Sequence, residues 1–373
     1  MTHQIENMKQ HKVIISGGGS GGHIFPAIAI AKSLLELDKN IDLLFVGASD
    51  KMEMEKVPSA GFKIIGLWIS GFHRKNILRN LLFPLKLLFS IVKSFFIILK
   101  FQPNLVIGTG GFASGPILFV ASLFKIPTLI QEQNSYAGIT NKLLAKYVDK
   151  ICVAYDDMHR FFPQNKIIKT GNPIRKNIIE NTTSLEKAKN DFKIDNNNLT
   201  VLVVGGSLGA RTINTSILNS LSLFKQEKLN LIWQTGQHFS AIAVNAVKEF
   251  EKDGISTFSF IKNIENAYKA ADIIISRAGA IAISELCVIG KPVILIPSPN
   301  VAENHQFKNA QSLVNKNAAL LVKDSQANDK LVLKIISLKN DIQLMKELSV
   351  NIKNMEAKEA SSIIAAHAMS LIK

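Results

Sequence analysis

The strongest constraint on the fold is a pattern that occurs once in each half of the chain. Residues 13–16 form a short apolar run that opens into the loop GGGSGGH, residues 17–23, before a helical pattern over residues 26–37. Residues 199–204 open in the same way into GGSLGAR, before a helix from Thr212. Such a loop is a phosphate cradle, because backbone N–H groups and a helix N-terminus face the anion. The pattern predicts an α/β protein with a parallel sheet in each half.

Residues 272–310 are expected to form a unit of one strand, one helix and a second strand. Strands are expected at residues 273–275 and 293–296, and Gly290 and Pro292 end the helix between them. The loops that follow these two strands fall at the carboxyl edge of the sheet, where open α/β sheets bind ligands. This segment is therefore a predicted ligand-binding edge.

Glu285 carries a carboxylate into the apolar helix of that segment, on the face that holds Ile281 and Val288. A buried carboxylate needs a partner, because burying it bare is costly. The partner is either a pair of ligand hydroxyls, as on a ribose, or a cation of the chain such as Arg277 or Lys291. Both interpretations remain open at this point.

The first glycine loop has a second possible use. Gly17, Gly19 and Gly22 satisfy GxGxxG, but the second strand, over residues 43–49, lacks the terminal acid that a dinucleotide site needs for ribose. NAD binding is therefore disfavoured. His23 ends the loop, where the positive end of a helix dipole favours a neutral imidazole that serves as a general base. A purely hydrogen-bonding or capping histidine fits the position equally well.

Length and composition narrow the class of protein. A chain of 373 residues suits two domains, and we place their junction after GNPIR, residues 171–175. The expected domains are residues 1–172 and 173–356, and the helix over about 357–373 is expected to pack back on the first. Two buried cysteines and the absence of a signal-peptide core indicate a cytoplasmic protein. The net charge of +15 favours an acidic partner.

The charge excess is regional, since residues 56–131 contain no Asp or Glu. Within this region, residues 77–100 form a long apolar stretch in which central lysines and Pro84 argue against a transmembrane span. On a helix, Arg79, Lys86, Lys93 and Lys100 form one basic stripe beside a wide apolar face. The helix therefore either lies on an anionic bilayer with its lysines at the headgroups, or packs in the core with its lysines in water.

The first half of the chain contains a second glycine loop, GTGGFASGP at residues 108–116, which follows the expected strand at residues 105–107. It implies a second anion contact on the same sheet edge. Glu132 and Asn134 then follow the strand at residues 128–130. They either face a ligand or cap the next helix.

Seven motifs occur in order along the chain: GGGSGGH, GGFASGP, QEQNSYAG, GNPIR, GGSLGA, RAGAIAISE and HQFKNA. Together they resemble the MurG glycosyltransferases of bacterial cell-wall synthesis over nearly the whole chain. The resemblance implies a GT-B fold of two facing, Rossmann-like domains with doubly wound parallel sheets. It also implies inverting transfer of N-acetylglucosamine from UDP-N-acetylglucosamine to the 4-hydroxyl of the muramic sugar of undecaprenyl-linked lipid I, giving lipid II.

The resemblance assigns expected roles to individual residues. In the second half it implies that Glu285 binds the ribose hydroxyls, that Arg175 contacts the nucleotide, that Ile261 contacts uracil through its backbone, and that Gln306 contacts the transferred sugar. The diphosphate positions are Ser207 and the amides of Ala280, Ile281 and Ala282. Ile283 and Ser284, next in the same helix, are further expected substrate-binding residues. From the first half, Ser20, Gly21 and Gly22 match donor-binding positions at the cleft, and Asn134 matches a sugar contact.

For the acceptor hydroxyl, His23 is the first candidate base and Glu132 the second. Two departures from the family occur: Ser20 and Ala282 stand where threonine is common, and Ala282 keeps only its backbone donor. No metal or cofactor is expected, because Asp156 and Asp157 are adjacent and make no Asp-x-Asp motif. The expected location is the cytoplasmic face of the inner membrane, with no nucleic acid as partner. The alternatives are another GT-B transferase with a different acceptor, or a non-catalytic basic protein that binds nucleic acid or membranes.

Overall fold

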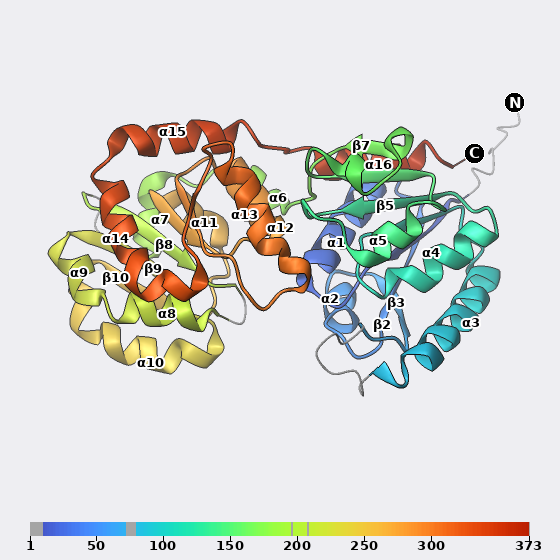
Figure 1. Cartoon of the computed structure of the whole chain (residues 1–373), viewed down its shortest axis with the longest axis horizontal. Helices are drawn as coiled ribbons and strands as arrows, with labels where there is room; N and C mark the ends of the chain where they lie inside the picture. The colour runs from blue at the N-terminus through green and yellow to red at the C-terminus, as the bar shows by residue number, and fades with distance from the viewer. Residues whose placement is uncertain (1–9, 72–79, 195–196, 207–208, 373) are drawn as a thin grey trace, which may run out of the picture. The chain divides into compact units, whose positions relative to one another are not determined.

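The computed structural model describes residues 10–71, 80–194, 197–206 and 209–372. These residues form two compact units (Figure 1). The first unit is Met1–Ile174 together with Glu359–Lys373, and the second is Arg175–Lys358. The chain therefore enters the second unit at Arg175 and returns to the first for its last helix.

The first unit is built on a sheet of seven described strands in the order β3-β2-β1-β4-β5-β6-β7, all parallel. The order reverses between β1 and β4, and the loops after those two strands lie side by side at this switch point. The strands are β1 Lys12–Ser16, β2 Asp42–Ala48, β3 Lys63–Leu67, β4 Leu105–Gly108, β5 Thr128–Glu132, β6 Lys150–Val153 and β7 Ile167–Lys169.

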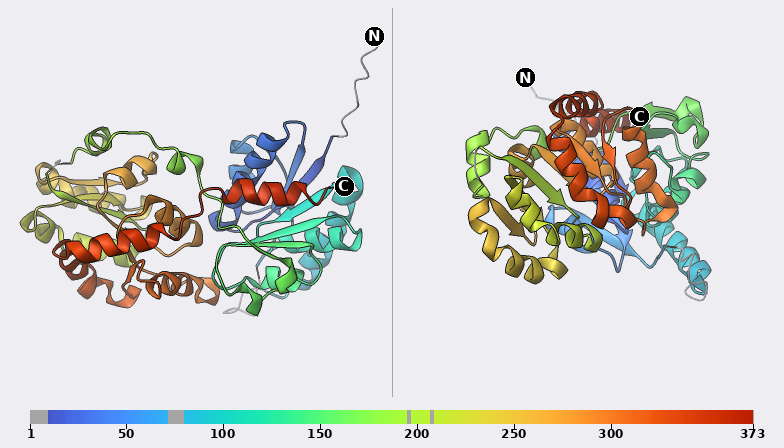
Figure 2. Two further views of the ribbon diagram at one scale, coloured as in Figure 1. Left: turned by 90° about the horizontal axis from the view of Figure 1, so that it is seen from above. Right: turned by 60° about the vertical axis from the view of Figure 1, so that its left-hand side comes forward.

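Helices cover both faces of this sheet. Val13 and Ile15 belong to one core cluster and Ile14 to another, because side chains alternate across a strand. The helices are α1 Gly21–Leu37, α2 Glu53–Ser59, α3 Phe83–Phe101, α4 Ser114–Leu123, α5 Ile139–Leu144 and α16 Ala360–Met369. The last of these, α16, packs on α1 and carries Ile364 into the cluster that holds Val13 (Figure 2).

The second unit repeats the plan with six described strands in the order β10-β9-β8-β11-β12-β13, again all parallel. The strands are β8 Leu199–Val204, β9 Leu229–Gln234, β10 Ile255–Phe258, β11 Ile273–Ser276, β12 Val293–Leu295 and β13 Leu320–Leu321. Its helices are α6 Lys176–Ile179, α7 Leu185–Asp191, α8 Arg211–Leu218, α9 Leu221–Gln226, α10 Gln237–Val247, α11 Ile264–Ala270, α12 Ala280–Ile289, α13 His305–Val314, α14 Ala327–Lys339 and α15 Ile342–Lys353. The predicted α/β class with two parallel, doubly wound sheets is confirmed.

Two helix boundaries differ from those expected. Helix α1 begins at Gly21 rather than at residue 26, so that Ser20 is its N-cap and His23 lies in its first turn. Pro26 lies inside the helix, where we expected it to mark the start. The helix expected over about 357–373 is α16, which begins at Ala360 and ends at Met369. Tertiary packing, rather than local helix propensity, determines where these helices begin, so the sequence pattern alone did not locate their ends.

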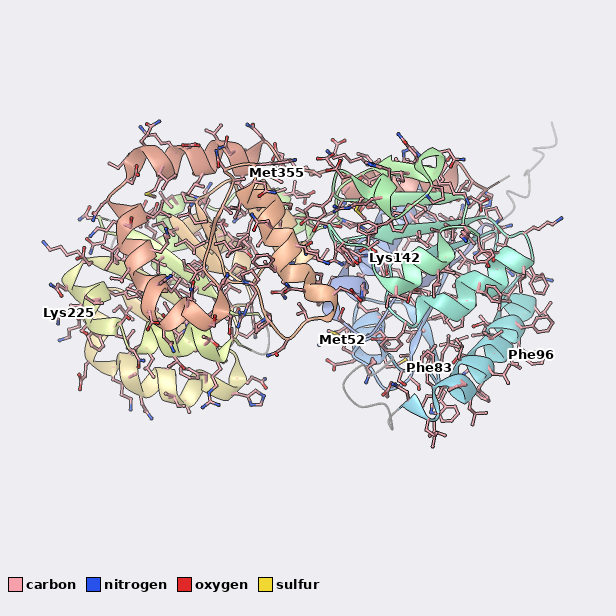
Figure 3. All side chains as sticks on the ribbon, viewed as in Figure 1. Met52, Phe83, Phe96, Lys142, Lys225 and Met355 are labelled. Carbon is pink, nitrogen blue, oxygen red and sulfur yellow. The ribbon has the colours of Figure 1, made fainter. Side chains whose placement is uncertain are left out.

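Two lysines of the expected basic stripe, Lys86 and Lys93, turn toward the protein on helix α3, whereas Lys100 is exposed. Neither interpretation of residues 77–100 expected inward lysines. The buried residues of α3 are Ser90, Ser94, Ile97 and Ile98. Lys93 Nζ donates to Gly66 O at 2.7 Å, and Lys86 Nζ donates to Ser70 Oγ at 3.3 Å. The wide apolar face is consequently exposed, and Figure 3 shows Phe96 on the outer side of the helix.

The first part of that stretch, Ile77 to Arg79, lies outside the described residues. No helix in the described part of the chain has the length and hydropathy that a bilayer crossing requires.

Candidate active site

Two segments with predicted diphosphate contacts follow neighbouring strands at the carboxyl edge of the second sheet. Strands β8 and β11 are neighbours, so the glycine loop after β8 and the start of α12 after β11 lie at one switch point. Gly209 has φ +79°, and a Cβ there would lie 2.2 Å from Thr235 O, so only glycine fits. Ser207, the predicted hydroxyl donor of this loop, lies outside the described residues.

The first turn of α12 supplies the other predicted contact. Gly279 is its N-cap, so the amides of Ala280, Ile281 and Ala282 have no acceptor within the helix. The amide of Ile283 donates to Gly279 O at 2.9 Å, and Ser284 Oγ donates to Ala280 O at 3.1 Å. The three leading amides, at the positive end of the helix dipole, are therefore the groups suited to an anion.

Glu285 is buried, with 4% of its surface exposed, and its partner is Arg175. Arg175 Nε and one terminal nitrogen each donate to a carboxylate oxygen of Glu285 at 2.8 Å. This bidentate pair joins two residues that we predicted as nucleotide contacts. The two cations expected as intrachain partners are wrong: Arg277 pairs with Asp324, and Lys291 Nζ donates to backbone carbonyls.

Burial raises the pKa of the Glu285 carboxyl, and the guanidinium of Arg175 and the hydroxyl of Tyr268 oppose that rise. Burial acts to lower the pKa of Arg175, but its hydrogen bond and attraction to Glu285 outweigh burial and raise it. Proton loss from Tyr268 is disfavoured by burial and then by the nearby Glu285, which together raise its pKa. The Tyr268 hydroxyl thus stays a donor to a carboxylate that is poorly solvated.

Gln234 is a residue of this edge that sequence reasoning missed. It ends β9, is 3% exposed, and accepts from the amide of Ile261 at 2.9 Å. Its Nε2 donates to Gly206 O at 3.4 Å. Gln234 therefore ties the predicted uracil contact to the glycine loop. Further along the edge, Gln306 Oε1 accepts from Ser298 N at 2.8 Å and holds the loop after β12.

In the first unit, the two glycine loops meet as their strand order requires. Gly18 N donates to Gly110 O at 3.4 Å, and Gly111 lies so close to Gly18 O that a Cβ there would be 2.2 Å from it. Gly111 also has φ +80°, which disfavours any other residue. Ser20, Gly21 and Gly22 form the start of α1 at this junction.

His23 lies against the second glycine loop. Its Nδ1 is 3.1 Å from Thr109 O and 3.3 Å from Gln133 Oε1. A backbone carbonyl only accepts hydrogen bonds, so Nδ1 carries the proton and Nε2 of the neutral ring carries the lone pair. This tautomer is the one that a base acting through Nε2 requires.

Glu132, the second candidate base, is engaged by four donors. Its Oε1 accepts from the amide and side chain of Asn134 at 3.0 and 3.2 Å. Its Oε2 accepts from Gly138 N and Asn141 Nδ2, both at 2.9 Å. Because the carboxylate is also only 2% exposed, its geometry is that of a group that fixes the turn before α5.

Glu53 also escaped sequence reasoning, although it shapes the first glycine loop. It is completely buried and accepts from Gly19 N at 3.1 Å and from Ala48 N at 2.9 Å. The Gly19 amide is therefore used by the protein, and the expectation that the whole loop offers bare amides is wrong. Ser20 is the N-cap of α1, so the amides of Gly21 and Gly22 in the first turn have no acceptor within the helix.

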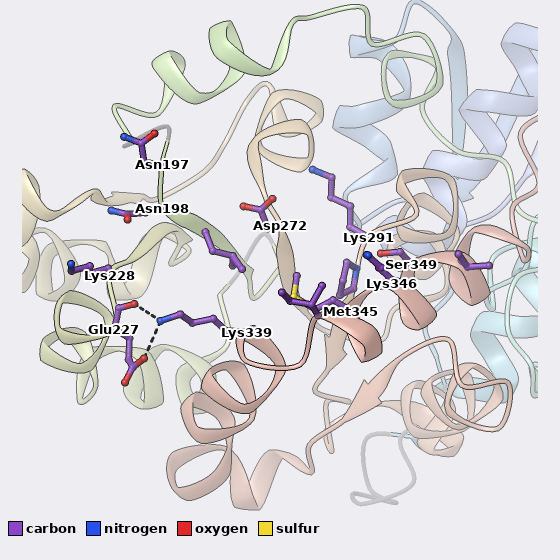
Figure 4. Close-up of a pocket in the computed structure, with 14 residues that line it drawn as sticks. Asn197, Asn198, Glu227, Lys228, Asp272, Lys291, Lys339, Met345, Lys346 and Ser349 are labelled. Atoms are coloured by element: carbon purple, nitrogen blue, oxygen red, sulfur yellow. Dashed lines mark hydrogen bonds and ion pairs between the residues drawn. The ribbon is translucent and has the colours of Figure 1, made fainter.

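A cavity of about 960 Å³ lies at the opposite, amino edge of the second sheet. Figure 4 shows Asp272, Lys291 and Lys346 around it, with Lys339 Nζ paired to Glu227 Oε2 at 3.0 Å. Burial lowers the pKa of Lys291 to about 8, although Asp272 opposes this. None of the predicted donor contacts within the described residues lines this cavity, so it is distinct from the carboxyl edge.

Two family models match the chain. Residues 13–153 match the glycosyltransferase family 28 N-terminal domain, and residues 200–364 match the family's C-terminal domain. The two matches cover the carboxyl edges of both sheets described above.

Several relatives are similar over nearly their whole length. The chain is 50% identical over 367 residues to a protein of Flavobacterium psychrophilum named UDP-N-acetylglucosamine–N-acetylmuramyl-(pentapeptide) pyrophosphoryl-undecaprenol N-acetylglucosamine transferase, covering 98% of this chain and 99% of the relative. A protein of Bacteroides fragilis with the same name is 49% identical over 362 residues, covering 96% and 95%.

The structure also matches solved structures over nearly the whole chain. The crystal structure of Acinetobacter baumannii MurG matches with a TM-score of 0.79 at 27% identity, covering 96% of this chain and 99% of that one. A UDP-GlcNAc 2-epimerase of Neisseria meningitidis matches with a TM-score of 0.67 at 16% identity, covering 96% and 100%, which shows the fold alone. The fold is thus GT-B, and the chain belongs to glycosyltransferase family 28, within its MurG group.

Proposed function

We infer that this protein transfers N-acetylglucosamine from UDP-N-acetylglucosamine to the 4-hydroxyl of the muramic sugar of lipid I, forming lipid II. The observation that carries this conclusion is the match at 50% identity over 98% of the chain to a transferase named for this reaction. The resemblance first drawn from seven sequence motifs identified the same family.

The second unit binds the donor. The leading amides of α12 and the glycine loop after β8 converge at one switch point, which suits a diphosphate. Glu285, in the second turn of the same helix, offers acceptor oxygens to the ribose hydroxyls, and Arg175 keeps that carboxylate ionised and oriented. Gln234 fixes the position of the uracil contact at Ile261 relative to this loop, because it hydrogen-bonds to both Ile261 and Gly206.

The first unit binds the acceptor and supplies the base. His23 Nε2 takes the proton of the attacking hydroxyl, while Nδ1 remains bound to Thr109 O. Asn134 and Glu132 shape the turn beside it, and the four donors on Glu132 favour His23 as the base. The start of α1 at Ser20, Gly21 and Gly22 is suited to a phosphate oxygen.

The leaving group needs charge stabilisation, because UDP departs with an additional negative charge on its diphosphate. The amides and dipole at the start of α12 supply it without reorganisation during the reaction. A single in-line displacement then inverts the anomeric centre, and no covalent enzyme intermediate is needed.

The protein docks on the cytoplasmic face of the inner membrane through α3. Along the outer face of this helix, Leu85, Leu88, Phe89, Val92, Phe96 and Leu99 are all between 47% and 62% exposed. A contiguous apolar face of this kind on a protein with a lipid-linked substrate is suited to the headgroup boundary of a bilayer. The absence of Asp and Glu from residues 56–131 removes repulsion from anionic lipids.

A donor and acceptor assay with product identification tests the reaction. The purified full-length protein is incubated with UDP-N-acetylglucosamine and a short-chain lipid I, and the products are identified by mass spectrometry. We expect UDP release and a lipid product that gains one N-acetylhexosamine. UDP should also raise the melting temperature by mass action. Release of UDP without glycosylation of the muramyl lipid, in the presence of another active acceptor, would contradict the assignment.

A further inference from the structure

Gln133 follows β5, is 1% exposed, and has an amide whose orientation the surrounding oxygens determine. Its Nε2 donates to Thr109 O at 2.6 Å and to Gln131 O at 3.3 Å, and also to Gln131 Oε1. All three neighbours are oxygens, so the opposite amide orientation would bring oxygen against oxygen. Gln133 Oε1 must therefore face His23 Nδ1, which lies 3.3 Å away.

Backbone carbonyls determine which way the side-chain amides of Asn172, Gln131 and Gln133 are oriented, because a carbonyl oxygen can only accept a hydrogen bond. Asn172 Nδ2 donates to Gln133 O at 3.0 Å, which turns Asn172 Oδ1 toward Gln131 Nε2 at 2.8 Å. The Gln131 amide is then oriented with Oε1 toward Gln133 Nε2. Asn172, Gln131 and Gln133 are each no more than 1% exposed, and in such surroundings polar groups keep their partners.

We propose that Gln133 is a positioning residue whose Oε1, as a second acceptor beside Thr109 O, holds His23 in its Nδ1–H tautomer and so presents the Nε2 lone pair to the acceptor hydroxyl. The proposal rests on the role of His23 as base given above. In the transfer step the acceptor oxygen bonds to the anomeric carbon, the bond from that carbon to UDP breaks, and the electron pair leaves on UDP. The hydroxyl proton passes to Nε2, and the imidazolium keeps its Nδ1–H bonded to Thr109 O and Gln133 Oε1.

The tautomer can be measured directly in the wild-type protein. Nitrogen-15 NMR of histidine-labelled full-length protein distinguishes Nδ1–H from Nε2–H rings, and loss of a signal in His23→Gln assigns His23. We expect the neutral ring to be in the Nδ1–H form. An Nε2–H ring in the wild type would overturn the proposal without any substitution at Gln133.

Gln133→Met keeps the side-chain volume but removes the acceptor that faces His23, together with the bonds that Gln133 Nε2 donates to Thr109 O and Gln131. We expect the His23 signal to move toward a mixture of tautomers and kcat to fall about fivefold to tenfold, as for the loss of one neutral hydrogen bond. Affinity for UDP should stay unchanged. Gln343→Met, on the exposed face of α15, is the matched control and should change neither quantity.

A double variant separates this inference from the function on which it rests. If Gln133 acts through His23, adding Gln133→Met to His23→Ala should lower turnover no further. Independent losses that multiply would overturn the positioning role. If His23→Ala alone keeps full turnover, the assignment of the base fails, whereas loss in His23→Ala with an unchanged tautomer and kcat in Gln133→Met contradicts only the present proposal.

Discussion

The ribose contact proposed for Glu285 places two opposing demands on its carboxylate. Ribose hydroxyls need ionised acceptor oxygens, yet burial raises the pKa of this carboxyl above its ordinary value of 4.5. Arg175 counters burial through two hydrogen bonds of 2.8 Å. Donor affinity should therefore depend on pH in a range where a solvated glutamate would already be fully ionised.

We predict that UDP binding to the wild type weakens as the pH falls through the folded-state pKa of Glu285, which lies above 4.5. The sign follows because protonation removes the ionised acceptor and the partner of Arg175. At neutral pH, Glu285→Gln should weaken UDP binding by about 10-fold to 150-fold, the range for charged hydrogen bonds. Isothermal titration calorimetry with UDP across the acidic range measures both effects.

Glu347→Gln is the control for this comparison, since Glu347 is an exposed carboxylate on α15. It should keep the wild-type affinity and pH dependence. UDP has its own ionisation, so the decisive quantity is the ratio of wild-type to Glu285→Gln affinity at each pH. A ratio that stays constant on acidification would show that Glu285 does not govern binding.

Sequence reasoning singled out Glu285 and His23 as candidate site residues but did not find the groups that hold them. Arg175 is 110 residues from Glu285, and His23 lies 86 residues from Thr109 and 110 from Gln133. No local periodicity reports contacts of that separation. Glu53 was missed for the same reason, because its role depends on the packing of α2 beneath a loop that lies 34 residues earlier.

Helix α3 shows how an element with a clear sequence pattern can pack against expectation. Its lysines share a face with Ser90 and Ser94, and this narrow face fits closely on β3, where Gly66 O accepts from Lys93. Lys86 also lies over the ring of Trp68, 5.6 Å from its centroid. Lys86 and Lys93 thus make contacts within the first unit, and the apolar side chains of α3 form an exposed surface.

We predict that membrane binding depends more on the apolar face of α3 than on Lys86 and Lys93. Replacing Leu88 and Phe96 by serine should weaken binding to liposomes at least tenfold, because each buried apolar side chain contributes about 1.5 to 3 kcal/mol. Sedimentation with liposomes of mixed neutral and anionic lipids measures this. A large part of wild-type binding should survive high salt, which screens charges but not apolar insertion.

Leu333→Ser is the control for that experiment, since Leu333 is 64% exposed on α14 of the second unit. It should leave liposome binding unchanged. If Leu88→Ser with Phe96→Ser binds as the wild type does, while Lys86→Glu with Lys93→Glu releases the protein, the charged stripe would be the membrane contact after all.

Most strands could be predicted because buried parallel strands are short apolar runs that glycine loops end, as at β1, β4 and β8. Strand β3 was missed because only its last residue is fully buried, which leaves a weak pattern. Strand β13 has two residues and exists through its pairing with β12. The start of α1 was misplaced because Gly21 and Gly22 favour a loop locally, whereas tertiary contacts extend the helix.

At the scale of the whole molecule, the first unit is assembled from both ends of the chain. Ile364, Ala365 and Ala368 of α16 are completely buried in the cluster that contains Val13 and Ile15 of β1. Lys150 Nζ also donates to Ser370 Oγ at 2.8 Å. The last helix is therefore part of the hydrophobic core of the first unit.

We predict that Ile364→Ala destabilises the first unit by about 2 to 5 kcal/mol, through lost burial and the cavity left behind. The two tryptophans separate the units, because Trp68 lies in the first and Trp233 in the second. Fluorescence-monitored urea unfolding of Trp68→Phe and Trp233→Phe backgrounds then follows each unit alone. Only the transition reported by Trp68 should shift.

Ile352→Ala provides the reciprocal control, since Ile352 is completely buried on α15 of the second unit. It should shift the transition reported by Trp233. Equal shifts of both transitions in Ile364→Ala would show that the last helix does not belong energetically to the first unit.

The two-sheet architecture was the most predictable feature, because the same strand, glycine loop and helix occur in both halves. The order of strands within each sheet follows from the handedness of parallel crossovers and from the switch point that the glycine loops mark. The orientation of a single helix is less predictable. Which face of α3 packs on the sheet depends on which face fits better, and the sequence pattern alone does not distinguish the two faces.

The return of α16 has a consequence for biosynthesis. The ribosome makes this helix after the whole of the second unit, so the nascent first unit carries an uncovered apolar patch over β1 and α1 while the intervening 184 residues, Arg175–Lys358, are translated. The second unit is free to fold during elongation, whereas the earlier-made one is completed last. Chaperone contacts during translation should accordingly concentrate on the half that emerged first.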